Sequence, residues 1–407
     1  MSPNVASEAP PAASPRQEGA ARRGGEPARA TPPVYALPVQ HRRDRTRFIK
    51  VPWSVYADDP VWVPPLVVER RQHLSQRNPF FAHARAQFWV AYRQGRPVGR
   101  ISAQVDDLHL ERYHDATGYF GFLECIDDGP TFHTLFTAAE EWLRQQGMRR
   151  AIGPFNFSIN DECGLLIDGF DTPPMFLMGH GRPYYDERVK QQGYRKAKDT
   201  VAYLLATAQS PPAVMQATVR RAGSGRIQVR PLRLAHLRED LDILRDIFND
   251  AWSDNWNYTP FTAAELAGLG QSLKLFVPPE FVQIAEVDGI PAAMIVVVPN
   301  LNESIRDLGG HLLPFGWLRL LWRLKWAGPR TGRVPLMGVR HAYQRSSLGM
   351  ALVFLLVEAV RGPVAQRGIE QMELSWTLED NRAMRHIKER LGARLYKTYR
   401  IYEKTLV

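Results

Sequence analysis

The stretch Tyr343-Gln-Arg-Ser-Ser-Leu-Gly-Met-Ala-Leu352 joins a short apolar run, 334–339, to a long helical pattern that begins at Leu348. A strand that turns into a helix through small and basic residues makes either an ordinary turn or a loop that holds phosphate. The backbone amides of such a loop and of the first helical turn lack intrahelical partners, and the helix dipole adds partial positive charge. Small residues let a phosphate approach, and Arg345 adds a further positive charge.

The composition is that of a globular, basic chain. Its 407 residues suffice for two or three domains, and 44% hydrophobic with 23% charged residues allow a packed core. The formal net charge of +10 favours anionic partners such as nucleic acid, phospholipid headgroups or phosphorylated cofactors. Because Lys and Arg are spread along the chain without a dense basic arm, we expect no nucleic-acid partner.

The two cysteines, Cys125 and Cys163, are too few for a disulfide framework, which favours a reducing compartment. The N-terminus lacks the apolar segment of a secretory signal, and we find no run of about 18 apolar residues. We therefore expect a cytoplasmic protein without a transmembrane segment. His109 and His114 have no third ligand nearby in the sequence, so no metal site is expected. Nothing in the sequence indicates an oligomeric state.

Internal similarity divides the chain into two related halves. Three pairs of segments match in the same order: 92–106 with 286–300, a helix-to-strand segment around Gly147 with one around Gly368, and 193–203 with 392–402. This order predicts two similar domains, 34–208 and 226–407, joined by a Pro-, Gly- and Ser-containing linker at 209–225. Residues 1–33, rich in Ala, Pro, Gly and Arg, are expected to be a disordered tail, and 300–333 an insertion in the second domain.

The second half shows the clearest order of elements. Strands are expected at 227–232, in a hairpin over 281–298, at 334–339, at 371–376 and at the end of the chain up to 403. Helices are expected at 236–252, 263–273, 348–366 and 381–391. This order indicates a mixed α/β fold, with a largely antiparallel twisted sheet flanked by helices in each half.

This element order, with the loop between the fourth strand and the third helix, resembles the GNAT superfamily of acyl-CoA N-acyltransferases. The hallmark of that family is Q/R-x-x-G-x-G/A, and the chain reads QRSSLG at 344–349, with Ser347 in place of the first glycine. A left-handed backbone conformation costs more for serine than for glycine, so Ser347 is a departure from the pattern. The resemblance implies acyl-CoA as the co-substrate and an amine as the acceptor. The residues expected to contact acyl-CoA are Val339, Gln344, Arg345, Ser346, Ser347, Leu348, Gly349, Met350 and Asn381.

The resemblance also implies roles around the thioester. A backbone N–H near Val339 would hold the carbonyl oxygen. Asn381 stands where the family often contacts the pantetheine arm, although a helix N-cap is an equally good interpretation. Many members carry a Tyr seven residues later that protonates the leaving thiolate, and this chain has Lys388 there. Either the usual general acid is missing, or another residue such as Tyr399 or Tyr402 supplies it.

The first half keeps the layout but lacks the loop, since 118–136 contains no Q/R-x-x-G-x-G. We therefore expect no coenzyme A site there. Its most unusual stretch is GPFNFSINDECGLLIDGFD at 153–171, where Asn160, Asp161 and Glu162 crowd beside Phe and Cys. A carboxylate in an apolar setting can have a raised pKa and accept a proton from an amine, so Asp161 and Glu162 are the candidate bases. A turn rich in Asn and Asp is the alternative interpretation.

The insertion reads HLLPFGWLRLLWRLKWAGPRTGR at 311–333, with five Lys and Arg residues and no acid. Trp317, Trp322 and Trp326 stand among leucines, and Arg319 and Arg323 share a helical face at i, i+4. A short, basic, Trp-rich amphipathic helix is typical of a segment at a membrane interface, which predicts peripheral contact with the inner membrane. The alternative is a helix packed on its own protein, with Arg at the rim.

Four stretches indicate which group within the GNAT superfamily the chain resembles. They are VPWSVYADDPVWVPPL at 51–66, NPFFAHARAQFWVAYRQGRPVGRI at 78–101, GPFNFSINDECGLLIDGF at 153–170 and PFGWLRLLW at 314–322. Together they are similar to a bacterial group of GNAT-type acyltransferases, part of which resembles the bacterial ceramide synthases. That resemblance implies direct attack of a sphingoid-base amine on an acyl-CoA thioester. The alternatives are acetyl transfer to a small polar amine or a protein lysine, and a non-catalytic protein that binds coenzyme A or lipid.

Overall fold

The computed structural model describes residues 32–222 and 225–407, so the predicted tail lies outside the described residues except for its last two. The strands of the first half are β1 (Val34–Pro38), β2 (Ala84–Arg93), β3 (Arg96–Asp106), β4 (Thr117–Cys125), β5 (Arg150–Gly153), β6 (Phe155–Asn156), β7 (Glu162–Cys163), β8 (Leu165–Asp168) and β9 (Arg195–Ala206). Its helices are α1 (Arg42–Val55), α2 (Val67–His73), α3 (Asp107–Tyr113), α4 (Gly129–Gln145) and α5 (Tyr185–Gln191).

The predicted elements of the second half all occur, close to their expected bounds. Its strands are β10 (Ile227–Pro231), β11 (Val282–Val287), β12 (Ile290–Pro299), β13 (Thr331–Val339), β14 (Gln371–Leu378) and β15 (Arg394–Thr405). Its helices are α7 (Leu237–Ala251), α8 (Ala263–Leu273), α11 (Ser347–Gln366) and α12 (Arg382–Arg390). The insertion holds α9 (Leu301–Ile305), α10 (Gly316–Trp322) and a π-helical turn, η4 (Arg323–Ala327). The predicted linker contains a helix, α6 (Ala213–Ala222), which packs on α11.

One large sheet runs through both halves, in the strand order β1-β2-β3-β4-β5-β15-β9-β14-β13-β12-β11-β10. Along this order the described neighbours are antiparallel except for two pairs, β4 with β5 and β13 with β14. Each half therefore contributes a meander of antiparallel strands followed by one parallel step. Between the strands of each parallel step the chain forms a long helix, α4 in the first half and α11 in the second.

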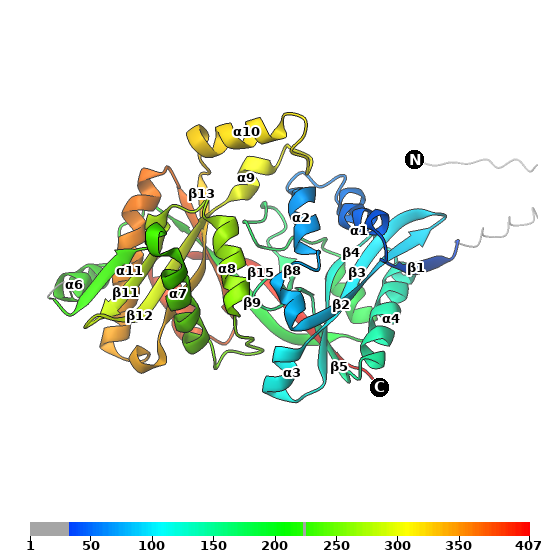
Figure 1. Cartoon of the computed structure of the whole chain (residues 1–407), viewed down its shortest axis with the longest axis horizontal. Helices are drawn as coiled ribbons and strands as arrows, with labels where there is room; N and C mark the ends of the chain where they lie inside the picture. Colours follow the sequence, from blue (N-terminus) through cyan, green and yellow to red (C-terminus); the bar gives the residue numbers. More distant parts are fainter. Residues whose placement is uncertain (1–31, 223–224) are drawn as a thin grey trace, which may run out of the picture. The chain divides into compact units, whose positions relative to one another are not determined.

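The last strands of the two halves change places. β9, from the first half, lies between β14 and β15, and β15, from the second half, lies between β5 and β9 (Figure 1). Lys404 on β15 donates to Glu140 on α4 at 2.7 Å, so side chains as well as backbone tie the exchanged strand to the first half. The sheet of each half is completed by the other, and residues 34–407 form one compact unit.

The matching segments 92–106 and 286–300 both lie in antiparallel hairpins, β2–β3 in the first half and β11–β12 in the second. Each turns through two residues with positive φ, Gln94 and Gly95 in the first and Asp288 and Gly289 in the second. A two-residue turn of this kind matches the right-handed twist of the strands that it connects.

Helices pack on the sheet because their apolar residues recur at helical spacing. Helix α11 buries seven residues along its length, including Leu352, Leu356, Val360 and Val364, and it packs against β11, β12 and β13. In the described part of the chain, α11 alone has the length and apolar composition to cross a membrane. A buried core helix meets the same criteria, and the contacts of α11 are those of a core helix.

Candidate active site

The parallel strands β13 and β14 separate part of the way along their length. They pair only between 331–334 and 371–374. Beyond this point β13 stays with β12 as far as Val339, while β14 stays with β9 as far as Leu378. The divergence opens a fork in the sheet, and the residues just past it, Pro335 and Ser375, line a pocket.

The pocket holds about 1240 Å³ of empty space, part of it open to solvent, between α11, α12 and the forked strands. Because apolar side chains dominate its walls, the pocket suits a ligand with a long apolar part. Helix α11 contributes Val353, Val357, Val360 and Val364 to these walls, and α12 with its C-cap contributes Met384, Ile387 and Leu391. Polar lining residues include Gln209, Asn255, Asn381 and Lys388.

The predicted phosphate loop lies at the start of α11, which begins at Ser347. Ser346 is the N-cap, and its hydroxyl accepts from the Gly349 amide at 3.0 Å. Within residues 32–222 and 225–407, the amides of Ser347 and Leu348 make no hydrogen bond. These two donors at the positive end of a 20-residue helix can bind an anion.

Packing requires a glycine at position 349, because a Cβ there would lie 2.2 Å from the backbone carbonyl oxygen of Tyr343. The expectation of backbone strain at Ser347 is wrong, since Ser347 is helical and the left-handed residue of the loop is Arg345, with φ of 58°. Arg345, Ser347 and Met350 are exposed, so solvent reaches this face of the loop.

Val339 and Gln344 support the loop from the end of β13. Val339 is the last residue of the strand and pairs with Ala293 of β12. The Gln344 side chain donates to the Val339 carbonyl at 2.8 Å, which makes it a brace between strand and loop. Neither residue is among those that line the pocket, so the structure does not bring them to the aliphatic part of the site.

The interpretation of Asn381 as a helix N-cap is confirmed, and its contact with the pantetheine arm stays a prediction. Its side chain accepts from the Met384 amide at 3.1 Å, so it is the N-cap of α12. It also lines the pocket. The cap and a contact to a bound ligand are compatible, since an amide side chain carries one acceptor oxygen and two N–H donors.

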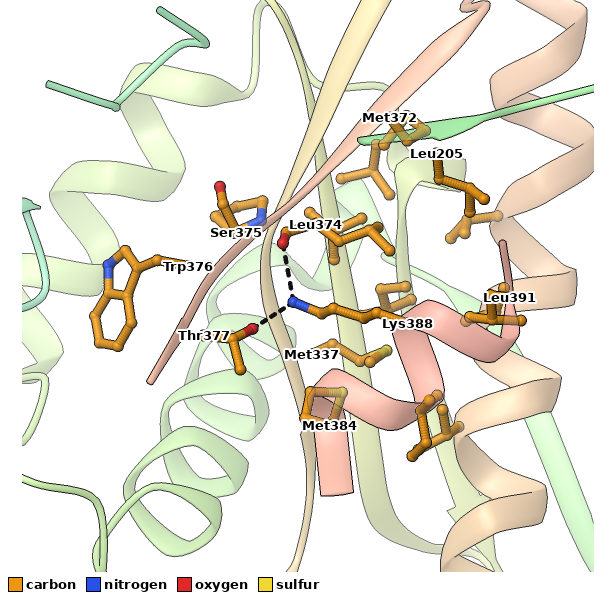
Figure 2. A pocket seen from close by; sticks show the side chains of 18 of the residues that line it. Leu205, Met337, Met372, Leu374, Ser375, Trp376, Thr377, Met384, Lys388 and Leu391 are labelled. Atoms are coloured by element: carbon orange, nitrogen blue, oxygen red, sulfur yellow. Dashed lines mark hydrogen bonds between the residues drawn. The ribbon is translucent and has the colours of Figure 1, made fainter. Parts of the chain in front are cut away.

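Lys388 lies in the pocket wall and is only 7% exposed. Its ammonium donates to the Leu374 carbonyl at 2.9 Å and to the Thr377 hydroxyl (Figure 2). Burial disfavours the charged form and lowers the pKa of Lys388 to about 7, against the opposing influence of Glu373. A lysine with such a pKa can hold or release a proton at neutral pH.

The sequence does not predict the buried polar network at the fork. Arg333 on β13 donates to the Ser375 hydroxyl at 2.7 Å, and Glu373 accepts from Ser375 and Tyr396. Desolvation lowers the pKa of Arg333 despite the nearby Glu373. The network fixes β13 and β14 where they part. Arg333, counted in the sequence among the cations of the insertion, is only 5% exposed.

The corresponding fork of the first half is closed by its own chain. Strands β4 and β5 pair only over 117–119 of β4, and β6 follows β5 at once. At Gly121 of β4 a Cβ would lie 1.7 Å from the Phe155 carbonyl oxygen. The Gln104 side-chain amide donates to the same carbonyl at 2.7 Å. Protein atoms therefore fill the place that corresponds to the pocket of the second half.

The start of α4 differs from that of α11 as well. The Asp128 carboxylate is the N-cap and accepts from the Thr131 amide at 2.8 Å. Hydrogen bonds from Arg93 and Thr131 outweigh desolvation and lower the pKa of Asp128. A carboxylate therefore already occupies the position that a phosphate would take at this helix.

The two candidate bases of the 153–171 stretch have different environments. Glu162 accepts from Arg70 at 2.5 Å and from Asn156 at 3.0 Å, and these contacts outweigh desolvation and lower its pKa to about 2. The expectation of a raised pKa is thus wrong for Glu162. The expectation of a raised pKa is confirmed for Asp161, because desolvation raises the pKa of this carboxyl to about 7. Asn160 donates to the Thr259 carbonyl at 2.9 Å and ties this stretch to the second half.

The Asp161 side chain is exposed to solvent. More than a third of the residue is accessible to water, yet desolvation is the largest influence on its pKa. The carboxylate accepts from the Ser158 hydroxyl at 3.2 Å. An amine that approached Asp161 from solvent would meet an oxygen that can accept a proton at neutral pH.

Trp376 connects this stretch with the pocket. It lines the pocket, and it also packs against the hydrophobic cluster that includes Ile159 and Cys163. Figure 2 shows its ring on the opposite side of β14 from Lys388. The stretch that carries Asp161 and the pocket that carries Lys388 therefore meet at one strand.

The two tyrosines considered as acids lie away from the pocket lining. Tyr399 is fully buried on β15 beside Leu166. Its hydroxyl has no hydrogen-bond partner among the described residues, and burial raises its pKa well above the usual value. Tyr402 donates to Asp186 on α5. Lys388, in contrast, lines the pocket and is better placed to give a proton to a ligand there.

No protein-family model matches the chain. The chain is 46% identical over 375 residues to the protein named Bacterial ceramide synthase from Caulobacter vibrioides (strain NA1000 / CB15N), a match covering 92% of this chain and 98% of that protein. This chain belongs to the family of that protein. It is also 48% identical over 370 residues to Protein YghO of Escherichia coli (strain K12), covering 90% of this chain and 94% of that protein.

Solved structures agree on the fold. A tandem GNAT protein from the clavulanic acid biosynthesis pathway aligns with a TM-score of 0.56 at 14% identity and covers 92% of this chain and 99% of that chain. A GCN5-related glucosamine N-acetyltransferase region of a fungal enzyme aligns with a TM-score of 0.54 at 15% identity. This alignment covers 93% of this chain and 39% of that chain. The predicted tandem of GNAT-like halves is confirmed. Together with the family assignment, this makes the chain an acyltransferase.

The residues present fit acyl-CoA, the co-substrate that the fold implies. The free amides of Ser347 and Leu348 offer donors for a diphosphate, and Asn381 offers an amide for the pantetheine arm. The aliphatic pocket offers space for an acyl chain. In the described part of the chain no three His, Cys, Asp or Glu side chains form a group that could hold a metal ion.

The first prediction concerns the start of α11. Replacing Gly349→Ala forces the loop away from the Tyr343 carbonyl and misdirects the free amides, so affinity for coenzyme A should fall by about tenfold or more. Isothermal titration with coenzyme A measures this. The matched control is Gly268→Ala in α8, where the nearest atom would be Pro79 Cγ at 3.7 Å. Unchanged affinity in Gly349→Ala would refute the anion site.

The second prediction concerns the protonation of Lys388. Above pH 7 the unfolded chain keeps a proton that folded Lys388 has lost, so the contribution of this residue to stability rises with pH. Relative to Lys388→Met, the wild type should gain roughly 1.4 kcal/mol per pH unit between about pH 7.5 and 9.5. Urea unfolding at both pH values measures the difference, with Lys274→Met at the end of α8 as the control. A pH-independent difference would show that Lys388 keeps an ordinary pKa.

Proposed function

We propose that this protein transfers a long acyl chain from acyl-CoA to the primary amine of a lipid-like acceptor such as a sphingoid base. The observation that carries the proposal is the aliphatic pocket beside α11. The name of the Caulobacter relative, Bacterial ceramide synthase, points to the same kind of product. Acetyl transfer to a small amine is the second candidate, since the fold also occurs in acetyltransferases.

The pocket favours a long donor chain over an acetyl group. Each methylene that leaves water for an aliphatic wall contributes about 0.8 kcal/mol to binding. The row Val353, Val357, Val360 and Val364 provides such a wall along much of α11. An acetyl group would leave this space unfilled. The diphosphate of the donor would bind the Ser347 and Leu348 amides.

The chemistry would proceed by direct attack. Asp161 takes one proton from the acceptor ammonium, and the neutral amine attacks the thioester carbon to form a C–N bond. As the tetrahedral intermediate collapses, the C–S bond breaks, the leaving thiolate takes a proton from the Lys388 ammonium, and a second nitrogen proton leaves to solvent. Both residues have pKa values of about 7, so each has an appreciable population of the required form at neutral pH.

Filling the pocket should change the chain-length preference. Val357 is half-buried and lines the pocket, whereas Leu355 is half-buried on the same helix outside its lining. Val357→Trp should lower kcat/KM for a long-chain acyl-CoA by about tenfold or more and leave that for acetyl-CoA unchanged, since only the long chain needs the space. Thiol release with a sphingoid base as acceptor measures both.

In that assay Leu355→Trp should behave as the wild type does. A wild-type preference for acetyl-CoA would favour the second candidate function. Absence of thiol release with any amine and any acyl-CoA would instead favour a protein that binds coenzyme A or lipid without catalysis.

Substitutions at the adjacent carboxylates Asp161 and Glu162 should have different effects, one on the reaction rate and the other on the stability of the fold. Asp161→Asn should lower kcat near pH 7 by about a hundredfold or more, because the proton acceptor is lost. Glu162→Gln removes the carboxylate that accepts from Arg70 and leaves the more exposed Glu69 as its charged partner, so it should lower the folding free energy by roughly 1–3 kcal/mol. Thermal unfolding and rate measurements on both variants test this split. Full activity in Asp161→Asn would exclude Asp161 as the base.

A further inference from the structure

Helix α10 and the turn η4 carry a dense apolar surface. Of the 17 exposed large hydrophobic side chains in the described chain, seven lie between Leu313 and Trp326. No residue of α10 or η4 is buried, so these elements add little to the core. In Figure 1, α10 lies at the edge of the compact unit, beyond α9. The seven residues are Leu313, Phe315, Trp317, Leu318, Leu321, Trp322 and Trp326, which we call the apolar patch.

The patch follows the helical repeat. Leu318, Trp322 and Trp326 succeed one another at i, i+4, and Trp317 and Leu321 do the same beside them. Leu320 and Leu324, at other positions of the repeat, are half-buried. The segment therefore directs one apolar face to solvent and another toward the protein. A contiguous exposed apolar face of this kind marks an interaction surface.

The segment is held firmly at its base. Arg323 donates to the Ser304 carbonyl at 2.8 Å and to the Asp307 carboxylate at 2.8 Å. The Glu303 carboxylate accepts from the Arg330 amide at 2.8 Å. The prediction that Arg323 faces a membrane beside Arg319 is therefore wrong, because Arg323 anchors the helix to the body. The apolar face is preformed, so its exposure does not depend on unfolding the insertion.

The charge around the patch selects one kind of partner. Arg319 and Lys325 are exposed within it, and the Lys325 ammonium lies 4.7 Å from the centre of the Trp326 ring. The sequence from 311 to 333 contains no acidic residue that would repel an anionic surface. Indole rings favour the boundary between hydrocarbon and polar headgroups, and exposed cations are attracted to anionic lipids. A second protein copy would have to offer both an apolar and an acidic face.

We propose that the apolar patch, with Arg319 and Lys325, docks the protein peripherally on a bilayer that contains anionic phospholipid. The patch would enter the headgroup region with the indoles at the interface, while the rest of the chain stays in water. Because it rests on the segment 313–326 alone, the proposal is independent of the substrates proposed above.

The test is sedimentation of the full chain with vesicles of phosphatidylglycerol and phosphatidylcholine, against vesicles of phosphatidylcholine alone. Binding should require the anionic lipid and weaken at high salt. The variant Trp317→Ala/Trp322→Ala/Trp326→Ala should lower the partition coefficient by about tenfold or more, because three large apolar side chains are lost from the contact. Arg319→Glu/Lys325→Glu should abolish the preference for anionic vesicles.

The matched control is Leu275→Ala/Val214→Ala, which removes two exposed apolar side chains elsewhere and should leave vesicle binding unchanged. The proposal fails if the wild type does not sediment with anionic vesicles, if the tryptophan variant sediments as the wild type does, or if the charge variant keeps the lipid preference. A dimer that the tryptophan variant dissociates, without vesicle binding, would assign the patch to a second copy of the chain instead. Coenzyme A titration of the tryptophan variant shows whether it remains folded.

Discussion

The exchange of β9 and β15 is the constraint on which the rest of the structure depends. Each half lacks its own last strand and receives that of the other, so neither sheet is complete alone. β9 supports β14 at the point where β14 leaves β13. The width of the fork, and with it the pocket, is thus set in part by a strand that the first half supplies.

Both halves contain a pair of parallel strands that separate from each other, but the space between the separated strands differs. In the second half the fork is open, the helix begins with free amides, and aliphatic side chains surround a space. In the first half the fork is filled around Phe155, and Asp128 occupies the start of the helix. The chain that fills the first fork continues into the stretch that carries Asp161. The two halves have therefore diverged: one keeps an open cavity, and the other places polar side chains on the far side of β14.

Local pattern is enough to predict the second half, because its helices and strands have strong periodicity and the loop at 344–349 has a characteristic sequence. The exchange cannot be predicted in this way, since β9 and β15 resemble each other in sequence and either pairing satisfies the pattern. Asp161 and Glu162 are neighbours with opposite pKa shifts, and the difference comes from Arg70, 92 residues before Glu162. Arg333 likewise looks like a surface cation until Ser375, 42 residues later, is placed beside it.

The position of β15 also governs the order in which the protein can be completed on the ribosome. The first half is synthesised early, but the place between β5 and β9 can be filled only after residues 394–405 have left the exit tunnel. Until then the nascent chain presents two unpaired strand edges to its surroundings. Truncation that removes β15 would leave the edges of β5 and β9 exposed permanently. Both strands belong to the first half, although the truncation removes residues of the second half.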